Sequence, residues 1–299
     1  MKIRAAKEQR IRQALIQWYG EHQRRMPWRE TRDPYRIWLS EVMLQQTQVK
    51  TVIPYYRRFL KRFPTIRHLA RGDLQEVLKM WEGLGYYARA RNFHRAAGVV
   101  TDAHDGRIPD RWEAFIKLPG VGEYTASAVQ SLAFGHPHAV VDGNVKRVLA
   151  RLFLIADPVN KPATYKLLKD IATQLMDRTR PGTFNQALME LGALVCKPAH
   201  PDCGRCPVHR DCGAFQENRA NEFPKKARRK PVPTVHMTAG VIRKKGTILI
   251  TRRKPEGLLG GLWEFPGGAL QKGEDAAVGC VRSIRATTGL EVEIDTHIT

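Results

Sequence analysis

The sequence is poor in acidic residues: 29 Asp and Glu stand against 50 Lys and Arg among 299 residues. The resulting net charge of +21 at pH 7, with a pI near 10.1, excludes an acidic surface and favours a polyanionic ligand. A nucleic acid fits this charge better than an anionic membrane surface or a generally basic exterior. Its binding should weaken as the salt concentration rises.

Long apolar runs are also lacking. Residues 139–141, Ala-Val-Val, are typical of the runs present and fall far short of the roughly 20 residues of a membrane span. Residues 1–7 are charged and contain no apolar core of a signal peptide. No repeat of fixed period is visible. We expect a monomer of the bacterial cytosol and nucleoid, with no membrane partner.

Cysteine is scarce, with five residues, yet four of them fall within residues 196–212. These four are Cys196, Cys203, Cys206 and Cys212. In a cytosolic chain such crowding indicates a metal or cluster site rather than disulfides. The spacing alone leaves both Zn²⁺ and a [4Fe–4S] cluster open, although only Cys203 and Cys206 form the close pair typical of zinc ribbons. The fifth, Cys280, is expected to be a small buried residue.

The pattern of apolar residues divides the chain into three parts. Residues 1–222 predict a mainly helical region, with apolar side chains at helical spacing. Residues 223–233 are basic and contain prolines, which is typical of a linker. Residues 234–299 change to β-branched segments and then a helix near residues 275–288, which predicts a smaller α+β domain. With about 70 residues, against the roughly 100–150 of an ordinary domain, this second domain is expected to be truncated.

Residues 118–126, Leu-Pro-Gly-Val-Gly-Glu-Tyr-Thr-Ala, place glycines just before a predicted helix. Backbone N–H groups at such a turn can approach a phosphate, and the helix dipole favours the anion. As a bare pattern, the glycines could also mark only a tight turn between helices. The candidate DNA contacts are Leu118, Gly120, Val121 and Gly122. Twenty residues after Gly122 comes Asp142, in Val-Asp-Gly-Asn-Val.

The hairpin, the downstream aspartate and the cysteine loop, in this order, resemble the helix-hairpin-helix superfamily of DNA repair glycosylases, to which endonuclease III belongs. The resemblance covers about residues 25–215. It implies a helix-hairpin-helix glycosylase fold with an iron–sulfur loop, and a [4Fe–4S] cluster rather than zinc at the four cysteines. Bifunctional members place a Schiff-base lysine where this chain has Tyr124, so a lyase acting through a covalent imine is not expected.

Residues 27–29 and 33–49 resemble the N-terminal signature of the MutY family of adenine DNA glycosylases, which act on adenine opposite 8-oxoguanine. Pyrimidine-specific relatives share the Leu-Gln-Gln-Thr core but lack an acid at the Glu41 position. Adenine leaves only when a ring nitrogen is protonated, so Glu41 must hold its proton near pH 7, as burial allows. The resemblance implies that an ionised Asp142 stabilises the sugar cation, and that Asn144 and Tyr124 orient the aspartate and the sugar.

The target base must leave the duplex before this chemistry can occur. The resemblance implies that Gln46 and Tyr86 fill or wedge the duplex near the lesion. It also implies that the adenine pocket is lined by Trp28, Arg29 and Gln186, and that Leu44 contacts the substrate DNA. The expected partner is double-stranded DNA that contains an adenine mispair.

Residues 261–268, Gly-Leu-Trp-Glu-Phe-Pro-Gly-Gly, resemble the opening of a Nudix fold. Glu274 and Arg282 follow at the Nudix spacing, but the metal-binding glutamates do not. Their places are taken by Ser283, Ala286 and Thr287. Without those acids a Mg²⁺-dependent phosphohydrolase is not expected. The resemblance implies a Nudix-like domain that recognises 8-oxoguanine.

Two further alternatives stay open from the sequence alone. The first is an endonuclease III-type pyrimidine glycosylase and lyase, which Tyr124 and Glu41 disfavour. The second is a non-catalytic DNA-binding module with an iron–sulfur cluster, which the presence of both Glu41 and Asp142 disfavours. Adenine release, borohydride-trappable strand cleavage and binding without turnover distinguish these readings.

Overall fold

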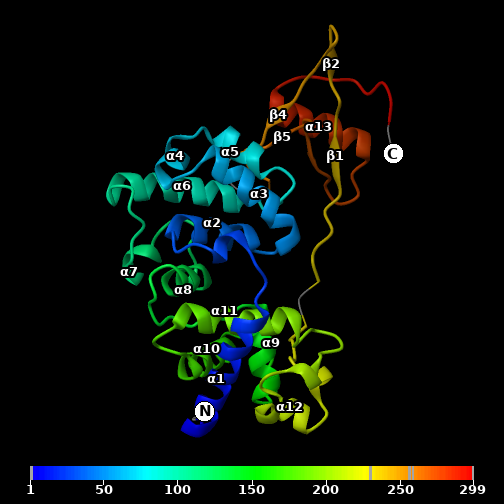
Figure 1. Cartoon of the computed structure of the whole chain (residues 1–299). Helices are drawn as coiled ribbons and strands as arrows, with labels where there is room; N and C mark the ends of the chain where they lie inside the picture. Colours follow the sequence, from blue (N-terminus) through cyan, green and yellow to red (C-terminus); the bar gives the residue numbers. More distant parts are fainter. Residues whose placement is uncertain (1–2, 229–230, 255–256, 258, 298–299) are drawn as a thin grey trace. The chain divides into compact units, whose positions relative to one another are not determined.

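The computed structural model describes residues 3–228, 231–254, 257 and 259–297. The chain divides into two compact units, Met1–Arg228 and Arg229–Thr299, each drawn in Figure 1. The first is mainly helical, as the apolar spacing predicts, and the second combines short strands with one helix. None of the helices in the described part of the chain has the length and apolarity needed to cross a membrane.

The first unit is built from twelve α-helices and four 3-10 turns within the described residues. The α-helices are α1 (Ala5–His22), α2 (Pro34–Leu44), α3 (Val49–Arg62), α4 (Ile66–Arg71), α5 (Leu74–Trp81), α6 (Ala88–Ala103), α7 (Trp112–Phe115), α8 (Glu123–Leu132), α9 (Gly143–Leu152), α10 (Pro162–Leu175), α11 (Pro181–Leu194) and α12 (Gly213–Gln216). The 3-10 turns are η1 (Pro27–Arg29), η2 (Cys203–Arg205), η3 (His209–Asp211) and η4 (Ala220–Glu222).

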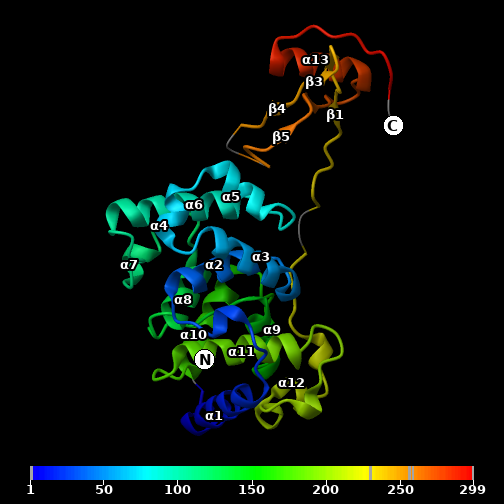
Figure 2. The ribbon, with the colours of Figure 1, turned by 45° about the horizontal axis from the view of Figure 1, so that its top comes forward.

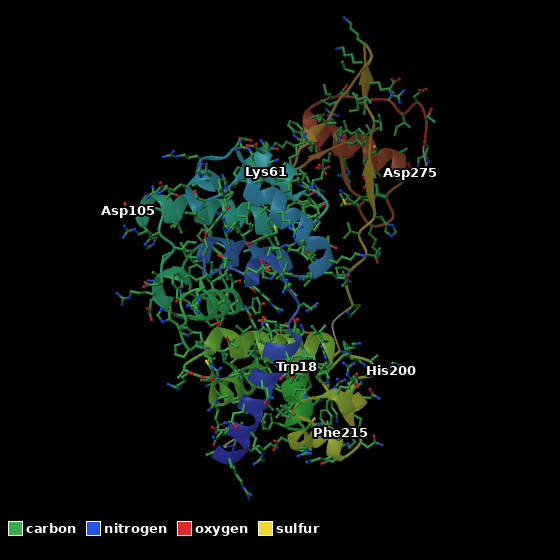
Figure 3. All side chains as sticks on the ribbon, viewed as in Figure 1. Trp18, Lys61, Asp105, His200, Phe215 and Asp275 are labelled. Carbon is green, nitrogen blue, oxygen red and sulfur yellow. The ribbon has the colours of Figure 1, made fainter. Side chains whose placement is uncertain are left out.

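These helices form two groups that both Figure 1 and Figure 2 show. In one group α2 packs against α3, α6 and α8, and α6 packs against α4 and α5. In the other, α11 packs against α1 and α9, and a large apolar core fills the space between them and α10. Helix α1 buries Ile11, Leu15 and Trp18 in this core, and Trp18 is labelled in Figure 3. Because α11 also packs against α8, the two groups meet where α8 lies against α11.

The start of α2 shows how local sequence places a helix at this junction. The Asp33 side chain caps the helix by accepting hydrogen bonds from Tyr35 N at 2.9 Å and Arg36 N at 3.4 Å. Pro34 occupies the first helical position, where its missing N–H costs nothing. The helix then runs through an almost wholly buried segment that contains Glu41.

Within its described residues, the second unit contains three two-stranded antiparallel sheets and α13 (Ala276–Thr288). The strands are β1 (Met237–Ala239), β2 (Arg243–Lys244), β3 (Thr247–Ile248), β4 (Thr251–Arg252), β5 (Trp263–Glu264) and β6 (Gly267–Ala269). They pair as β1 with β6, β2 with β3 and β4 with β5. Helix α13, capped by Asp275 (labelled in Figure 3), packs against β6 and β1.

Two expectations for this unit meet different outcomes. Cys280 is buried, as predicted for a lone cysteine. The β-branched segment from Val235 to Ile242, expected to be strand-like, forms a strand only at Met237–Ala239, where it pairs with the three residues of β6. Apolar side chains on and beside these short ladders stay exposed, among them Met237, Ile250 and Trp263.

Candidate active site

Glu41 lies in the buried stretch of α2, and its side chain is only 5% exposed. The Tyr124 hydroxyl of α8 donates a hydrogen bond to Glu41 Oε2 at 2.8 Å. Burial is the largest influence and raises the pKa of Glu41 to about 7. The Tyr124 bond lowers this pKa and the nearby charge of Asp142 raises it further. A protonated Glu41 is therefore available near neutral pH.

Asp142 is the N-cap of α9, and its two carboxyl oxygens have separate donors. Val145 N donates to Oδ1 at 2.7 Å, and Asn144 Nδ2 donates to Oδ2 at 3.0 Å. Burial raises the pKa of Asp142, while these hydrogen bonds and the charge of Arg147 lower it. The positive end of the α9 dipole also favours the carboxylate form.

Tyr124 connects α2, which carries Glu41, to α11. Its hydroxyl also lies 4.0 Å from Met189 Sδ of α11, so α2, α8 and α11 contribute to one cluster. Burial is the main reason that the pKa of Tyr124 lies well above 10, and the charges of Glu41 and Asp142 raise it further. The Tyr124 hydroxyl therefore keeps its proton, and donates it to Glu41, at neutral pH. The structure thus brings Glu41, Tyr124, Asp142 and Asn144 together.

Arg147, one turn into α9, connects this cluster to the cysteine loop. Its Nη2 donates to Asn144 Oδ1 at 2.9 Å and to the Gly192 carbonyl at 2.8 Å. Its Nε donates to the Cys196 carbonyl at 2.7 Å. Because Asn144 accepts from Arg147 and donates to Asp142, the orientation of its amide is fixed from both sides.

The expected pocket residues Trp28, Arg29 and Gln186 are held by partners that the sequence reading did not identify. Arg29 donates from both Nη atoms to Glu190 of α11, at 3.0 and 2.9 Å. The Tyr19 hydroxyl donates to Gln186 Oε1. The guanidinium of Arg29 is therefore bound in an ion pair with Glu190. The Gln186 amide oxygen is bound by Tyr19, so its amide nitrogen is the group that can bind a ligand.

Glu190 is the centre of a buried ion network. Arg24 also binds it, with Nε at 2.8 Å from Oε1 and Nη2 at 2.8 Å from Oε2. Burial alone would raise its pKa, but the hydrogen bonds from Arg24 and Arg29 lower the pKa of Glu190 to about 2. Nearby, the Trp28 ring packs edge-on against Tyr56, with 5.3 Å between ring centroids.

The expected duplex contacts lie on turns next to these helices. Leu44 is the last residue of α2 and is half-buried. Gln46, two residues on, is exposed and has φ +59°. Tyr86, just before α6, has φ +49° and is 60% exposed. Positive φ is uncommon in residues other than glycine, so both turns hold a defined backbone conformation.

The hairpin between α7 and α8 has buried apolar residues and exposed glycines. Leu118 and Val121 are buried, whereas Gly120 and Gly122 are exposed. Gly120 has φ +74°, and a Cβ there would lie 2.6 Å from Asn92 Cβ. Gly122 caps α8 and has no side chain to bond the first N–H groups of the helix. The hairpin therefore presents backbone N–H groups that can bind an anion.

The four clustered cysteines follow α11, and none of them forms a disulfide. Cys196, Cys206 and Cys212 pack against the apolar core, and Arg151 Nη1 lies 3.3 Å from Cys196 Sγ. Burial, together with the charges of the other three thiols, raises the pKa of Cys206 to about 12. Among the described residues, no three His, Cys, Asp or Glu side chains have the arrangement of a single metal-ion site.

The donor set nevertheless fits a cluster. A four-iron cluster takes one thiolate on each of its irons, so its ligands need not converge on one point. The Arg151 guanidinium places a positive charge beside the Cys196 sulfur. Arg151 is 2% exposed and also donates to the Lys197 carbonyl at 2.6 Å and to the Pro198 carbonyl at 2.9 Å, which fixes the start of the loop.

The sequence reading missed several residues that organise this site. Arg147 and Arg151 stand one helical turn apart within the apolar helix α9, and an arginine repeated at that spacing was the available signal. Asp142 precedes an apolar-periodic run, which is the pattern of a helix N-cap. For Arg89, which binds backbone carbonyls of two separate turns, no local pattern gives a signal.

Comparison with known proteins agrees with this geometry. Residues 39–174 match the family described as HhH-GPD superfamily base excision DNA repair protein, and residues 238–299 match the NUDIX domain. A solved structure of a thermostable thymine-DNA glycosylase is 30% identical, with a TM-score of 0.66, over 71% of this chain and 98% of that one. A trapped endonuclease III–DNA covalent intermediate, 24% identical with a TM-score of 0.60, covers the same shares and shows the same fold.

The fold and site therefore define a helix-hairpin-helix protein of the base excision repair superfamily. The adenine DNA glycosylase of Buchnera aphidicola subsp. Baizongia pistaciae (strain Bp) is 38% identical over 85% of this chain and 72% of that protein. The one from Rattus norvegicus is 40% identical over 87% of this chain. The chain belongs to the adenine DNA glycosylase family. It spans 61% of the length of the rat protein.

Proposed function

We propose that this protein is a monofunctional DNA glycosylase that hydrolyses the N-glycosidic bond of adenine mispaired with 8-oxoguanine or guanine. The observation that carries the proposal is a buried glutamate with a pKa of about 7, bonded to Tyr124 and close enough to Asp142 to sense its charge. Two carboxyls with different environments are the requirement for acid-assisted glycoside cleavage. The relatives named above are called adenine DNA glycosylases, which supports the choice of base.

In the proposed reaction, protonated Glu41 donates its proton to a ring nitrogen of the extruded adenine. The bond between the base nitrogen and the sugar C1′ then breaks, and its electron pair leaves with the neutral base. Positive charge develops on the sugar and is stabilised by the carboxylate of Asp142. A water oxygen adds to C1′, and the proton it loses passes to a carboxylate, so atoms and charge balance.

Asn144 and Tyr124 are proposed to act through position. Asn144 donates a hydrogen bond to one carboxyl oxygen of Asp142. The other lone pairs of that carboxylate stay available to the sugar cation. Tyr124 keeps the Glu41 carboxyl in place and, as a neutral donor, moderates its pKa without ionising. A lysine at this position would instead form an imine with the sugar. A lyase of the endonuclease III type is therefore the weaker alternative.

Recognition of double-stranded DNA is proposed to involve the charge of the whole chain and two features of the first unit. The net charge of +21 supplies attraction to phosphate, and the hairpin from Leu118 to Gly122 supplies backbone donors. Gln46 and Tyr86, on exposed turns, are proposed to enter the duplex when adenine leaves it, with Leu44 beside them. The extruded base is proposed to lie against Trp28, Arg29 and Gln186.

We also propose that the four clustered cysteines hold a [4Fe–4S] cluster, which would close residues 196–212 into one rigid loop through four iron–thiolate bonds. The proposed domains are residues 1–222 for the glycosylase, 223–233 for the linker and 234–299 for a Nudix-like lesion-recognition domain. In the described part of that domain, Glu274 is bonded to Arg282 at 2.6 Å and to Gln271 N at 2.8 Å, so its carboxylate is already occupied.

The test is single-turnover adenine release from two duplexes, with adenine opposite either 8-oxoguanine or guanine. Alkali reveals the abasic sites, and borohydride trapping monitors any imine. Release that is faster opposite 8-oxoguanine, without trapping, supports the proposal. Efficient trapping would favour the lyase alternative. Binding of both duplexes without release would favour a non-catalytic module.

A further inference from the structure

Two exposed turns of the first unit share an unusual backbone feature. Gln46 follows the end of α2 and Tyr86 precedes the start of α6, and each has φ near +50° to +60°. A side chain other than glycine pays steric energy for this conformation, so surrounding contacts must hold it. The two turns are 40 residues apart in sequence.

One side chain, Arg89 of α6, holds both turns. Its Nη1 donates to three carbonyls at the end of α2, and its Nη2 donates to two carbonyls before Tyr86. These acceptors are the carbonyl oxygens of Val42 (2.9 Å), Met43 (2.9 Å), Gln45 (2.6 Å), Leu84 (3.1 Å) and Gly85 (3.1 Å). Nη2 also lies 3.3 Å from Thr47 Oγ1. The planar guanidinium, with fixed donors on two nitrogens, can serve both sides at once.

The same guanidinium supports the exposed ring. Its central carbon lies 5.6 Å from the centroid of Tyr86 and 5.4 Å from that of the buried Trp81. Tyr86 is 60% exposed, so its ring has a large free surface, backed by a cation that the backbone holds in place. An exposed aromatic ring on a rigid support can insert between bases or stack on one.

The turn after α2 is also tied to the helix of the hairpin. Gln45 Nε2 donates to Thr125 Oγ1 of α8 at 3.3 Å. Glu41 lies one turn earlier on α2. Arg89 thus fixes the position of Gln46 and Tyr86 relative to the helix that carries the proposed acid.

We propose that Arg89 is a positioning residue that sets Gln46 and Tyr86 at a fixed separation, so that both enter the duplex together when adenine is extruded. This inference rests on the proposed function. Arg89 itself takes no part in bond cleavage, because both of its Nη atoms are bound to backbone carbonyls and to Thr47 Oγ1. Its loss therefore affects the extrusion of the base and leaves the proton transfer from Glu41 intact.

The test compares Arg89→Lys in the full chain with the wild-type protein on two DNA probes. The first probe is a duplex with adenine opposite 8-oxoguanine. The second places adenine opposite a tetrahydrofuran abasic analogue, where no opposite base has to be unpaired. Lysine keeps the charge but cannot bridge two groups of carbonyls. Arg89→Lys should slow single-turnover release from the first probe on the order of 10- to 100-fold and from the second much less.

A double-mutant cycle separates positioning from a general loss of folding. In the Gln46→Ala, Tyr86→Ala background, adding Arg89→Lys should have little further effect on release. The two side chains that Arg89 positions are already absent from this background. The pH at which release is half-maximal should not move. Arg95→Lys, on the exposed side of the same helix, is the matched control and should behave as wild type.

Equal slowing on both probes, or a full additional loss in the double-alanine background, would overturn the positioning role. A shifted pH profile would also overturn it, since that would mean Arg89 acts through Glu41. If the wild-type protein released adenine from neither probe, the proposed function would fail first. Unfolding temperatures of each variant show whether the chain is still folded.

Discussion

The end of α2 around Glu41 and the start of α9 around Asp142 carry the same functional group in opposite surroundings. Glu41 lies inside a helix, among buried side chains, with the neutral Tyr124 hydroxyl as its donor. Asp142 lies at a helix N-terminus, with Val145 N and the Asn144 amide as donors. The comparison shows that the place of a carboxyl along a helix decides how many donors its ionised form has.

The physical reason is the supply of N–H groups. Inside a helix every backbone N–H is bonded to a carbonyl four residues earlier, so a buried carboxylate there has no backbone N–H to bind. The first turn of a helix has free N–H groups and the positive end of the dipole. Burial raises the pKa of both acids, but only Asp142 has several donors to its ionised form.

The largest loss of adenine release is expected from a variant in which residue 41 has no proton to donate. Glu41→Gln keeps the shape but has no acidic proton, so single-turnover adenine release should fall on the order of 10²- to 10⁴-fold. Binding to the mispair duplex, measured by fluorescence anisotropy, should be retained. Glu113→Gln, at an exposed glutamate of α7, is the control. Release by Glu41→Gln within a few-fold of wild type would show that Glu41 is not the acid.

A somewhat smaller loss of adenine release is expected from a substitution at Asp142. Asp142→Asn removes the negative charge that faces the sugar cation, and release should fall on the order of 10²- to 10³-fold. The same variant should lose the acidic limb of the pH–rate profile, because Asp142 must be ionised and its pKa is raised by burial. An acidic limb that persists unchanged in Asp142→Asn would assign that limb to another group.

The two regions should also differ in how they affect stability. Glu41 has a folded-state pKa of about 7, above its ordinary value of 4.5, so between these pH values the folded protein retains a proton that the unfolded chain has lost. The free energy of unfolding should therefore fall as pH rises through this window, by about 3 kcal/mol. Urea unfolding of wild type and Glu41→Gln at pH 4.5 and 8 isolates this contribution. A difference between the two proteins that did not depend on pH would contradict it.

The smallest effect is expected from removing the Tyr124 hydroxyl, the hydrogen-bond donor to Glu41. The Tyr124 hydrogen bond lowers the pKa of Glu41, so Tyr124→Phe should raise that pKa. Because release needs the protonated acid, the alkaline limb, near pH 7 in the wild type, should move to higher pH. The rate at the optimum should fall by roughly tenfold or less, as expected for the loss of one hydrogen bond. A limb that moves to lower pH would reverse the assigned role of Tyr124.

The sequence predicts the helical region, the change to a mixed α and β unit and the residues that meet at the site, because these depend on local patterns and on the family resemblance. The burial of Glu41 is foreseeable from its apolar neighbours on α2. The ion network around Glu190 is not, because it joins η1 and α11 across more than 160 residues. Strand lengths in the second unit also depend on partners, since β1 can pair only along the length of β6.

Gly192, in the last turn of α11, connects helix stability with catalysis. A Cβ at this position would lie 2.5 Å from Asn144 Cβ, so only glycine allows α11 to approach the start of α9 this closely. Glycine inside a helix costs about 1 kcal/mol relative to alanine. Gly192→Ala would gain helix propensity, but its methyl group would displace Asn144 and so loosen the hold on Asp142. At this residue the chain has a weaker helix in exchange for a well-placed carboxylate, a stability–activity trade-off.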